Sequence, residues 1–265
     1  MLLVIDVGNT NTVLGLYDGD QLVHDWRIRT VSEHTVDEYG MLIFNLYQSS
    51  RIKTKEIKAI TGIIISCVVP PMLNILEPLC KKYFNVNPLI VGPGIKTGMP
   101  IFYDNPKEVG ADRIANAIAA MHFYPNKNLI VVDFGTATTF CVISKKKEYL
   151  GGIILPGVKI SMEALESKTA QLPIVEIKKT DAVIGKSTVE SIQSGLYHGQ
   201  IGIVRELKAK IIQEAFADEP PIVLATGGFS RLFEDENLFK EIIPTLALQG
   251  LYFAYMMNQK QKKEE

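Results

Sequence analysis

The chain opens with Leu2-Leu3-Val4-Ile5-Asp6-Val7-Gly8-Asn9-Thr10-Asn11-Thr12, and a similar stretch, Leu129-Ile130-Val131-Val132-Asp133-Phe134-Gly135-Thr136-Ala137-Thr138-Thr139, returns 127 residues later. In each copy an apolar run leads into an Asp, a Gly follows two residues on, and short polar side chains precede a second apolar run. Read without a gap, the copies pair Asp6 with Asp133, Gly8 with Gly135 and Thr12 with Thr139. The repetition predicts two similar β-hairpins and a duplicated fold.

The residue types in the repeat indicate a polyphosphate site. A carboxylate at a strand end can hold hydrated Mg²⁺, which binds proteins through one or two carboxylates plus phosphate oxygens. Glycine lets backbone N–H groups approach phosphate, and short hydroxyl and amide side chains add donors. An ordinary tight turn explains either copy alone. Two copies in register favour a polyphosphate site over two ordinary turns. One nucleotide is then expected to be held between two lobes.

Composition and charge narrow the class of protein. The chain has 265 residues, a formal net charge of −1 and a sequence pI near 6.5, so we expect no nucleic-acid partner. Its three cysteines, Cys67, Cys80 and Cys141, lack metal-ligand spacing and are typical of reduced, buried thiols, which predicts a cytoplasmic protein. The N-terminus has no basic signal-peptide region, and no apolar run is long enough to cross a membrane.

The order of elements predicts an α/β protein with a duplicated βββαβαβα arrangement and mixed sheets flanked by helices. We expect an N-terminal lobe over residues 1–126 and a C-terminal lobe over 127–265. The charged tail Lys260–Glu265 is expected to be solvated and without function. In the first half, strands are expected over 2–17, 21–29, 62–69 and 88–91. Helices are expected there over 36–47, over 70–83 and from about 110, with a Lys-rich turn at 53–58. In the second half, strands are expected from 129 to 154 and over 221–225, and helices after 156 and over 188–215.

A block from Tyr103-Asp104-Asn105-Pro106 to Gly110-Ala111-Asp112-Arg113 leads into the helix expected near Gly110. Asp112 and Arg113 fall in its first turn, where free N–H groups lie. Asp112 could simply cap that helix, with Arg113 paired to it. Alternatively, it is a base for phosphoryl transfer beside a cation that grips the substrate, since this chemistry asks mainly for a positioned acceptor.

Three glycine-containing segments allow more than one interpretation. Gly185-Lys186-Ser187-Thr188 resembles the end of a phosphate-binding Walker motif, but position 180 is Thr instead of the required Gly, so a capped helix N-terminus is favoured. Gly227-Gly228 after a strand permits close approach of a flat ligand such as adenosine, or forms a plain turn. Gly195, Gly199 and Gly202 line one face of the long helix and favour a close backbone contact, either with a dimer partner or with a neighbouring strand of the same chain.

Taken together, the motifs resemble the type III pantothenate kinase family over residues 1 to about 255. The residues that carry the resemblance are Asp6–Thr12, Asp104–Pro106, Gly110–Arg113, Asp133–Thr139, Gly151–Gly157 and Thr226–Gly228. The family belongs to the acetate and sugar kinase/Hsp70/actin superfamily, which implies two ribonuclease H-like lobes. The implied activity is ATP-dependent phosphorylation of the primary hydroxyl of pantothenate to 4'-phosphopantothenate, the first step towards coenzyme A.

The resemblance also implies roles for individual residues. Asp112 becomes the proton acceptor, Asp133 a monovalent-cation ligand and Asp6 a Mg²⁺ ligand. Family members are cytoplasmic, usually homodimeric, and use K⁺ or NH₄⁺ beside Mg²⁺. The implied ATP and phosphate contacts are Asp6, Val7, Gly8, Asn9, Thr10, Asn11, Thr12, Val13, Thr136, Gly227 and Gly228, and the implied pantothenate contacts are Tyr103, Gly110, Ala111, Asp112, Arg113 and Thr188.

Two other functional classes stay open on the sequence. An exopolyphosphatase-like phosphohydrolase of the same superfamily would share both Asp hairpins but would need a basic groove, which the near-neutral charge disfavours. A non-catalytic regulator on the same fold would tolerate loss of Asp6, Asp112 or Asp133, and all three are present.

Overall fold

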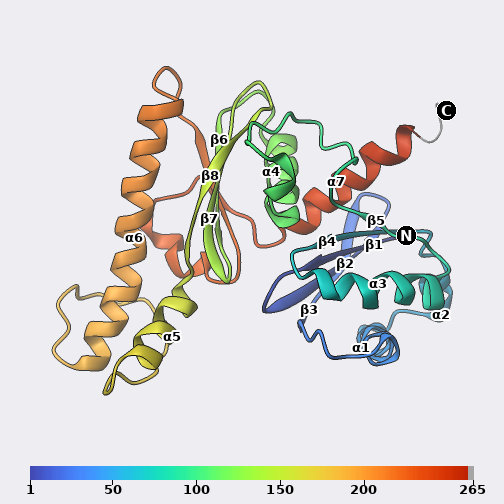
Figure 1. Ribbon diagram of the computed structural model, residues 1–265, viewed down its shortest axis with the longest axis horizontal. Helices are drawn as coiled ribbons and strands as arrows, with labels where there is room; N and C mark the ends of the chain where they lie inside the picture. Colours follow the sequence, from blue (N-terminus) through green and yellow to red (C-terminus); the bar gives the residue numbers. More distant parts are fainter. Residues whose placement is uncertain (262–265) are drawn as a thin grey trace. The chain divides into compact units, whose positions relative to one another are not determined.

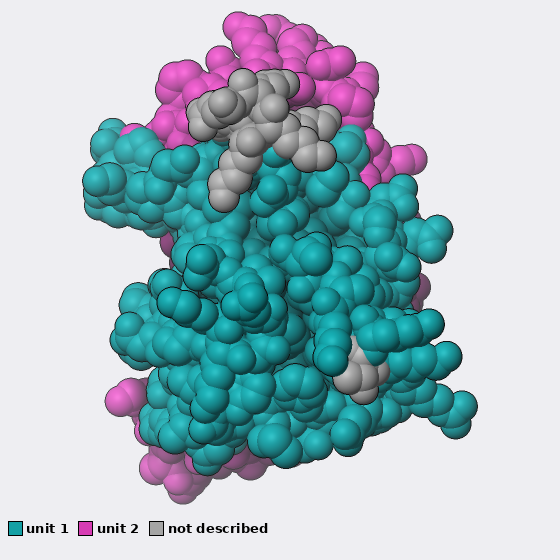
Figure 2. Space-filling model, turned by 90° about the vertical axis from the view of Figure 1, so that its right-hand side faces the viewer, with its two compact units in different colours: residues 1–98, 104–122, 246–265 teal, residues 99–103, 123–245 magenta. Residues whose placement is uncertain are grey.

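The computed structural model describes residues 1–261, without the side chains of Thr54, Lys260 and Gln261. The rest of the charged tail, 262–265, lies outside the described residues. The chain forms two compact units (Figure 2). The first contains Met1–Gly98, Asp104–His122 and Leu246–Gln261; the second contains Met99–Tyr103 and Phe123–Thr245.

The first unit is built on a five-stranded mixed sheet of order β3-β2-β1-β4-β5 (Figure 1). Strands β1 and β2 form an antiparallel hairpin, whereas β4 runs parallel to β1 on its other side. The strands are β1 (Leu2–Val7), β2 (Asn11–Asp18), β3 (Gln21–Arg29), β4 (Gly62–Cys67) and β5 (Leu89–Ile90), and the helices are α1 (Val36–Ser49), α2 (Thr54–Lys58), α3 (Leu73–Leu79), α4 (Ala111–Phe123) and α7 (Leu246–Gln261).

The two faces of this sheet are covered differently. Leu3, Ile5 and Val7 of β1 point into a core shared with α1 and α3. The alternate residues Val4 and Asp6 point to the opposite face, because side chains alternate along a strand. Helix α7 packs on β1, β2 and β4. Asp6 therefore projects from a sheet whose other face holds the apolar core.

Helix α7 explains why the compact units differ from the single boundary expected between residues 126 and 127. It follows the whole second half in the chain, yet it belongs to the first unit. Glycines make room for it: a Cβ at Gly15 would lie 3.1 Å from Leu248, and a Cβ at Gly62 would overlap the ring of Tyr255. This long-range packing leaves no local signal in the sequence.

The second unit repeats the same sheet order, β8-β7-β6-β9-β10 read from the equivalent edge. Strands β6 and β7 form the antiparallel hairpin and β9 runs parallel to β6. The expected α/β fold with a duplicated mixed sheet is thereby confirmed. Its elements are β6 (Leu129–Phe134), β7 (Ala137–Ile143), β8 (Tyr149–Pro156), α5 (Val158–Lys168), α6 (Thr188–Ala215), β9 (Ile222–Thr226) and β10 (Glu241–Ile242).

The gapless pairing of the two hairpins is wrong at its end. Asp6 lies opposite Val13 in the first hairpin, whereas Asp133 lies opposite Thr139 in the second. The first turn spans residues 8–11 and the second only 135–137, so the first holds one residue more. Thr12 therefore corresponds to Thr138, and both are buried.

Local structure departs from the sequence expectations in small ways. The Lys-rich turn expected at 53–58 forms the short helix α2. The helix expected over 70–83 is split into a 3-10 turn at Pro70–Met72, helix α3 and a π-helical turn at Cys80–Phe84. Helix α6 spans 188–215 as expected. No helix among residues 1–261 is long and apolar enough to cross a membrane.

The glycine stripe on α6 faces open space. Gly195, Gly199 and Gly202 are exposed, and a Cβ built on any of them meets no atom within 4 Å. The alternative of a close contact with a neighbouring strand of the same chain is therefore wrong. A dimer partner stays a prediction.

Candidate active site

The first hairpin presents an open loop supported from one side. The Gly8 N–H donates to the Asn11 carbonyl oxygen at 3.0 Å, which closes the turn. Thr30 holds it in place: its backbone N–H donates to the Thr10 carbonyl at 3.0 Å and its hydroxyl donates to the Gly8 carbonyl at 2.7 Å. Asn9 and Thr10 are exposed. A supported loop with exposed amide and hydroxyl groups suits phosphate oxygens.

Asp6 and the start of α4 meet at the same edge of the first sheet. The Val68 N–H, just past β4, donates to the Val7 carbonyl at 3.0 Å, so the ends of β1 and β4 lie side by side. Gly110 sits against this edge, because a Cβ on it would lie 3.8 Å from Val68 Cγ1. The end of the first hairpin and the Gly110–Arg113 block, which are far apart in sequence, therefore lie at one edge of the first sheet.

The carboxyl group of Asp112 is largely buried at the beginning of α4. Its Oδ1 accepts a hydrogen bond from the Arg113 backbone N–H at 2.8 Å, which is the capping contact considered from the sequence. Burial raises the pKa of Asp112 above its ordinary value, although this hydrogen bond and the Arg113 charge oppose the rise. A raised pKa makes the carboxylate a stronger base, so the capping contact and a role as base are compatible. The Arg113 side chain is also buried.

In the second unit, Gly227 and Gly157 pack closely against the backbone of the second hairpin. Gly227 has a φ of 90°, and a Cβ on it would collide with the Asp133 carboxylate and lie 2.6 Å from the Phe134 backbone nitrogen. A Cβ on Gly157 would lie 2.6 Å from the Gly135 carbonyl oxygen. Packing within the second unit thus requires a glycine at position 227. That a flat ligand such as adenosine approaches Gly227 stays a prediction. Gly228 is exposed.

Two further expected substrate residues also belong to the second unit. The Tyr103 ring lies against β8, with its centroid 6.5 Å from that of Tyr149. Thr188 is the first residue of α6 and is exposed. The Ser187 hydroxyl accepts from the Glu190 N–H at 3.2 Å, so this segment is a capped helix N-terminus, as expected, and not a Walker motif.

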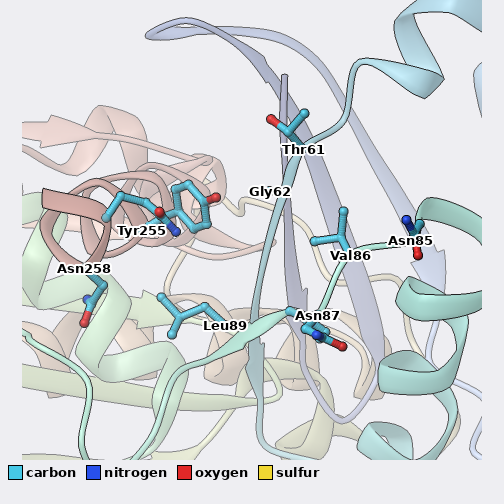
Figure 3. A pocket seen from close by; sticks show the side chains of 10 residues that line it. Thr61, Gly62, Asn85, Val86, Asn87, Leu89, Tyr255 and Asn258 are labelled. Atoms are coloured by element: carbon cyan, nitrogen blue, oxygen red, sulfur yellow. The ribbon is translucent and has the colours of Figure 1, made fainter. Parts of the chain in front are cut away.

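A pocket of about 460 Å³ lies at the other end of β4, lined by Thr61, Gly62, Asn85, Asn87, Leu89 and Tyr255 among others (Figure 3). Asn258 also lines this pocket, and its side-chain amide is already hydrogen-bonded within the protein. Its Nδ2 donates to the Lys96 carbonyl at 3.0 Å and to the Ala254 carbonyl at 2.7 Å. Strand β4 begins at the pocket and ends beside Asp6, so the pocket is separate from the candidate site.

Sequence reasoning missed two residues around the hairpins. Thr30 supports the first turn, and Ser66 lies beside Asp6 in the register of β1 with β4. The signal for Ser66 is a hydroxyl near the end of an apolar strand, after Ile63-Ile64-Ile65. Thr30 could have been noticed only from the pairing of β2 with β3.

Comparison with known proteins identifies similar chains along the whole length. Residues 2–210 match the family model described as type III pantothenate kinase. A type III pantothenate kinase of Syntrophus aciditrophicus is 58% identical over 259 residues, covering 97% of this chain and 100% of its own length. That of Geobacillus kaustophilus is 50% identical over 263 residues, covering 99% of this chain and 100% of its own length.

Solved structures share the fold at low sequence identity. A protein of Sinorhizobium meliloti named as a 2-dehydro-3-deoxygalactonokinase superimposes with a TM-score of 0.63 at 8% identity, over 97% of this chain and 99% of that one. A protein of Campylobacter jejuni named as a Baf family transcriptional activator has a TM-score of 0.60 at 18% identity, over 97% and 99%.

Proposed function

This chain belongs to the type III pantothenate kinase family, and we propose that it transfers the γ-phosphoryl group of ATP to the primary hydroxyl of pantothenate, forming 4'-phosphopantothenate for coenzyme A synthesis. The observation that carries the proposal is the meeting of the Asp6 hairpin with the Gly110–Arg113 block at one sheet edge. A phosphate-binding loop and a buried carboxylate side by side are the parts that phosphoryl transfer to an alcohol requires.

The roles divide between binding and proton transfer. The loop from Asp6 to Val13 binds the ATP phosphates, with Thr136, Gly227 and Gly228 as further nucleotide contacts. Asp112 accepts the proton of the attacking hydroxyl. The pantothenate contacts are Tyr103, Gly110, Ala111, Arg113 and Thr188.

The donors at Asp6 fit a divalent cation. Among residues 1–261 there is no group of three or more His, Cys, Asp or Glu side chains that could hold a metal. Mg²⁺ in nucleotide sites is usually held by one or two carboxylates plus phosphates and waters, and Asp6 supplies the carboxylate of that donor set, with the buried Ser66 beside it in the strand register. When bound, the cation neutralises charge on the transferring phosphoryl group. Asp133 is proposed as the ligand of K⁺ or NH₄⁺.

The test of the function is ADP release from ATP with and without pantothenate, together with identification of the product by mass spectrometry. We expect pantothenate-dependent release and phosphorylated pantothenate. Equal ADP release without pantothenate would favour a phosphohydrolase, and no turnover with intact nucleotide binding would favour a regulator.

Substitution of Asp112 separates chemistry from binding. Asp112→Asn keeps the size of the side chain and removes the base, so kcat should fall roughly 10²- to 10⁴-fold while ATP affinity stays close to wild type. Arg113→Ala should instead raise mainly the KM for pantothenate. Near-normal kcat in Asp112→Asn would leave Asp112 with its capping role alone.

We also propose a cytoplasmic homodimer whose contact includes the α6 glycine stripe. The support is that Gly195, Gly199 and Gly202 are exposed on a helix that also exposes Val189 and Ile203. Gly199→Leu should weaken the dimer, because a large side chain cannot fit where backbones approach. Analytical ultracentrifugation tests this: a native monomer, or an unchanged dimer in the folded variant, contradicts it.

A further inference from the structure

Ser66 on β4 carries a buried hydroxyl for which the fold supplies no partner. Its side chain is 0% exposed, and among the described residues its Oγ has no hydrogen-bond partner. Burying an unpaired hydroxyl costs free energy, and an apolar residue of similar size would avoid that cost. The residues before it on the strand, Ile63, Ile64 and Ile65, are apolar and buried. The hydroxyl is therefore not explained by packing.

The register of the sheet places this hydroxyl beside Asp6. Ser66 is the partner of Asp6 in the parallel pairing of β1 with β4, and paired residues project from the same face of neighbouring strands about 4.8 Å apart. The previous pair on this face, Val4 with Ile64, is apolar and fully buried. Asp6 is thus the polar residue that is paired with Ser66 on the neighbouring strand.

The neighbouring cysteine does not share this position. Cys67 follows on the opposite face, and its Sγ donates to the Val69 carbonyl at 3.1 Å.

The same juxtaposition occurs in the second sheet. Asp133 pairs with Thr226 across the parallel strands β6 and β9, and Thr226 is also buried. A hydroxyl residue therefore lies next to the strand-end Asp in both units, on strands outside the repeated hairpins. Because β4 and β9 are equivalent strands of the two sheets, the hydroxyl recurs with the carboxylate at the same place in the fold.

We propose that Ser66 is a positioning residue whose hydroxyl hydrogen-bonds a water in the coordination shell of the divalent cation bound at Asp6. The proposal rests on the proposed function, which assigns the cation to Asp6. Mg²⁺ keeps several of its waters when bound by one or two carboxylates, and these waters donate to nearby oxygen atoms. Ser66 Oγ has two acceptor lone pairs for this purpose.

Cation binding without turnover tests the proposal. Mn²⁺ is titrated by electron paramagnetic resonance in the presence of ATP and the absence of pantothenate, for wild type, Ser66→Ala and Ser66→Cys. Loss of an outer-shell partner typically costs 10- to 100-fold in metal affinity, so we expect the Mn²⁺ Kd to rise about 10-fold or more in both variants. Ser66→Cys keeps the side-chain volume nearly constant, and Cys67→Ala, on the opposite face, is the matched control and should bind Mn²⁺ as wild type does.

The outcomes separate this proposal from the assignment beneath it. Asp6→Asn is measured in parallel. If Asp6→Asn loses Mn²⁺ affinity while Ser66→Ala and Ser66→Cys keep it, Ser66 does not position the cation shell and the proposal is overturned. If Asp6→Asn also keeps it, the cation is not held at Asp6, and the assignment fails together with the proposal. A rise in Kd for the Ser66 variants, without a lower unfolding temperature in metal-free buffer, supports it.

Discussion

The two hairpins have the same strand order and burial pattern but differ at their turns. The first turn holds residues 8–11, leaves Asn9 and Thr10 exposed, and is supported by the Thr30 side chain. The second turn holds only residues 135–137. The Gly157 N–H, just after β8, donates to the Thr136 carbonyl at 3.2 Å. It takes the place of the Thr30 N–H, which donates to the Thr10 carbonyl in the first turn.

This difference indicates how a duplicated element acquires two roles. The first turn has an extra exposed residue, Asn9, and thus one more backbone N–H that can reach a ligand. The second is packed closely by its own chain at Gly157 and Gly227. We infer that the first hairpin is the main phosphate-binding loop and that the second serves the cation and the nucleotide's other end.

The strongest test shortens the first turn to the length of the second. Deleting Asn9 should lower kcat/KM for ATP by roughly 10²- to 10³-fold, the effect of losing one preorganised donor to a reacting group. Thermal stability should change little, because the second hairpin shows that a three-residue turn suits these strands. Asn9→Ala, which removes the side-chain amide but keeps the turn length and the backbone N–H, should lose less activity than the deletion. A fully active deletion variant would remove the distinction between the hairpins.

The second test compares Gly8, in the first turn, with Gly157, which follows β8 and packs against the second turn. Gly157→Ala should lower the free energy of unfolding by about 1–3 kcal/mol, because a Cβ there would crowd the Gly135 and Thr136 carbonyls. Its φ of −69° suits alanine, so the cost is steric. Gly8→Ala is the comparison variant and should cost less, because its Cβ would lie 3.2 Å from the Asn11 carbonyl oxygen, against 2.6 Å between a Gly157 Cβ and the Gly135 carbonyl oxygen. Equal stability of the two variants in urea denaturation would contradict this.

The third test assigns the monovalent cation to the second hairpin. Replacing Na⁺ with K⁺ at constant ionic strength should raise kcat about tenfold or more, within the range for ligands that tune a metal site. Asp133→Asn should abolish the difference between the salts, whereas Thr226→Ser, which keeps a hydroxyl beside Asp133, should preserve it. Identical rates of the wild type in both salts would exclude the cation.

The smallest expected effect concerns the stability of the first unit. Because burial raises the pKa of Asp112 in the folded protein above its unfolded value, the folded protein binds this proton more tightly than the unfolded chain does. This contribution to stability is fully present below the unfolded pKa and is lost as pH rises through the folded pKa. Asp112→Asn should therefore raise Tm at pH 7 in metal-free buffer, and the gain should shrink in acid. A lower Tm at pH 7 would show that the carboxylate stabilises the fold.

Much of the architecture could be read from local patterns. The hairpins, the strand after the Lys-rich segment and helix α6 were predicted because periodicity and turn residues report on neighbouring positions. The end of the repeat was misjudged for the same reason: a one-residue difference in a turn shifts the facing residue, and Asp6 faces Val13 while Asp133 faces Thr139. Turn length depends on support from another strand, through Thr30 or Gly157.

The sequence by itself determined the fold class, the duplication and the residue types of the site, because these depend on periodicity and on short motifs. The tertiary structure alone decided which of them meet. Asp112 lies at the sheet edge of Asp6 because Gly110 packs against Val68, and α7 joins the first unit because Gly15 and Gly62 admit its side chains. The orphan hydroxyl of Ser66 is likewise visible only once β4 is paired with β1. Contacts between residues distant in sequence depend on packing and strand pairing, and local patterns do not encode them.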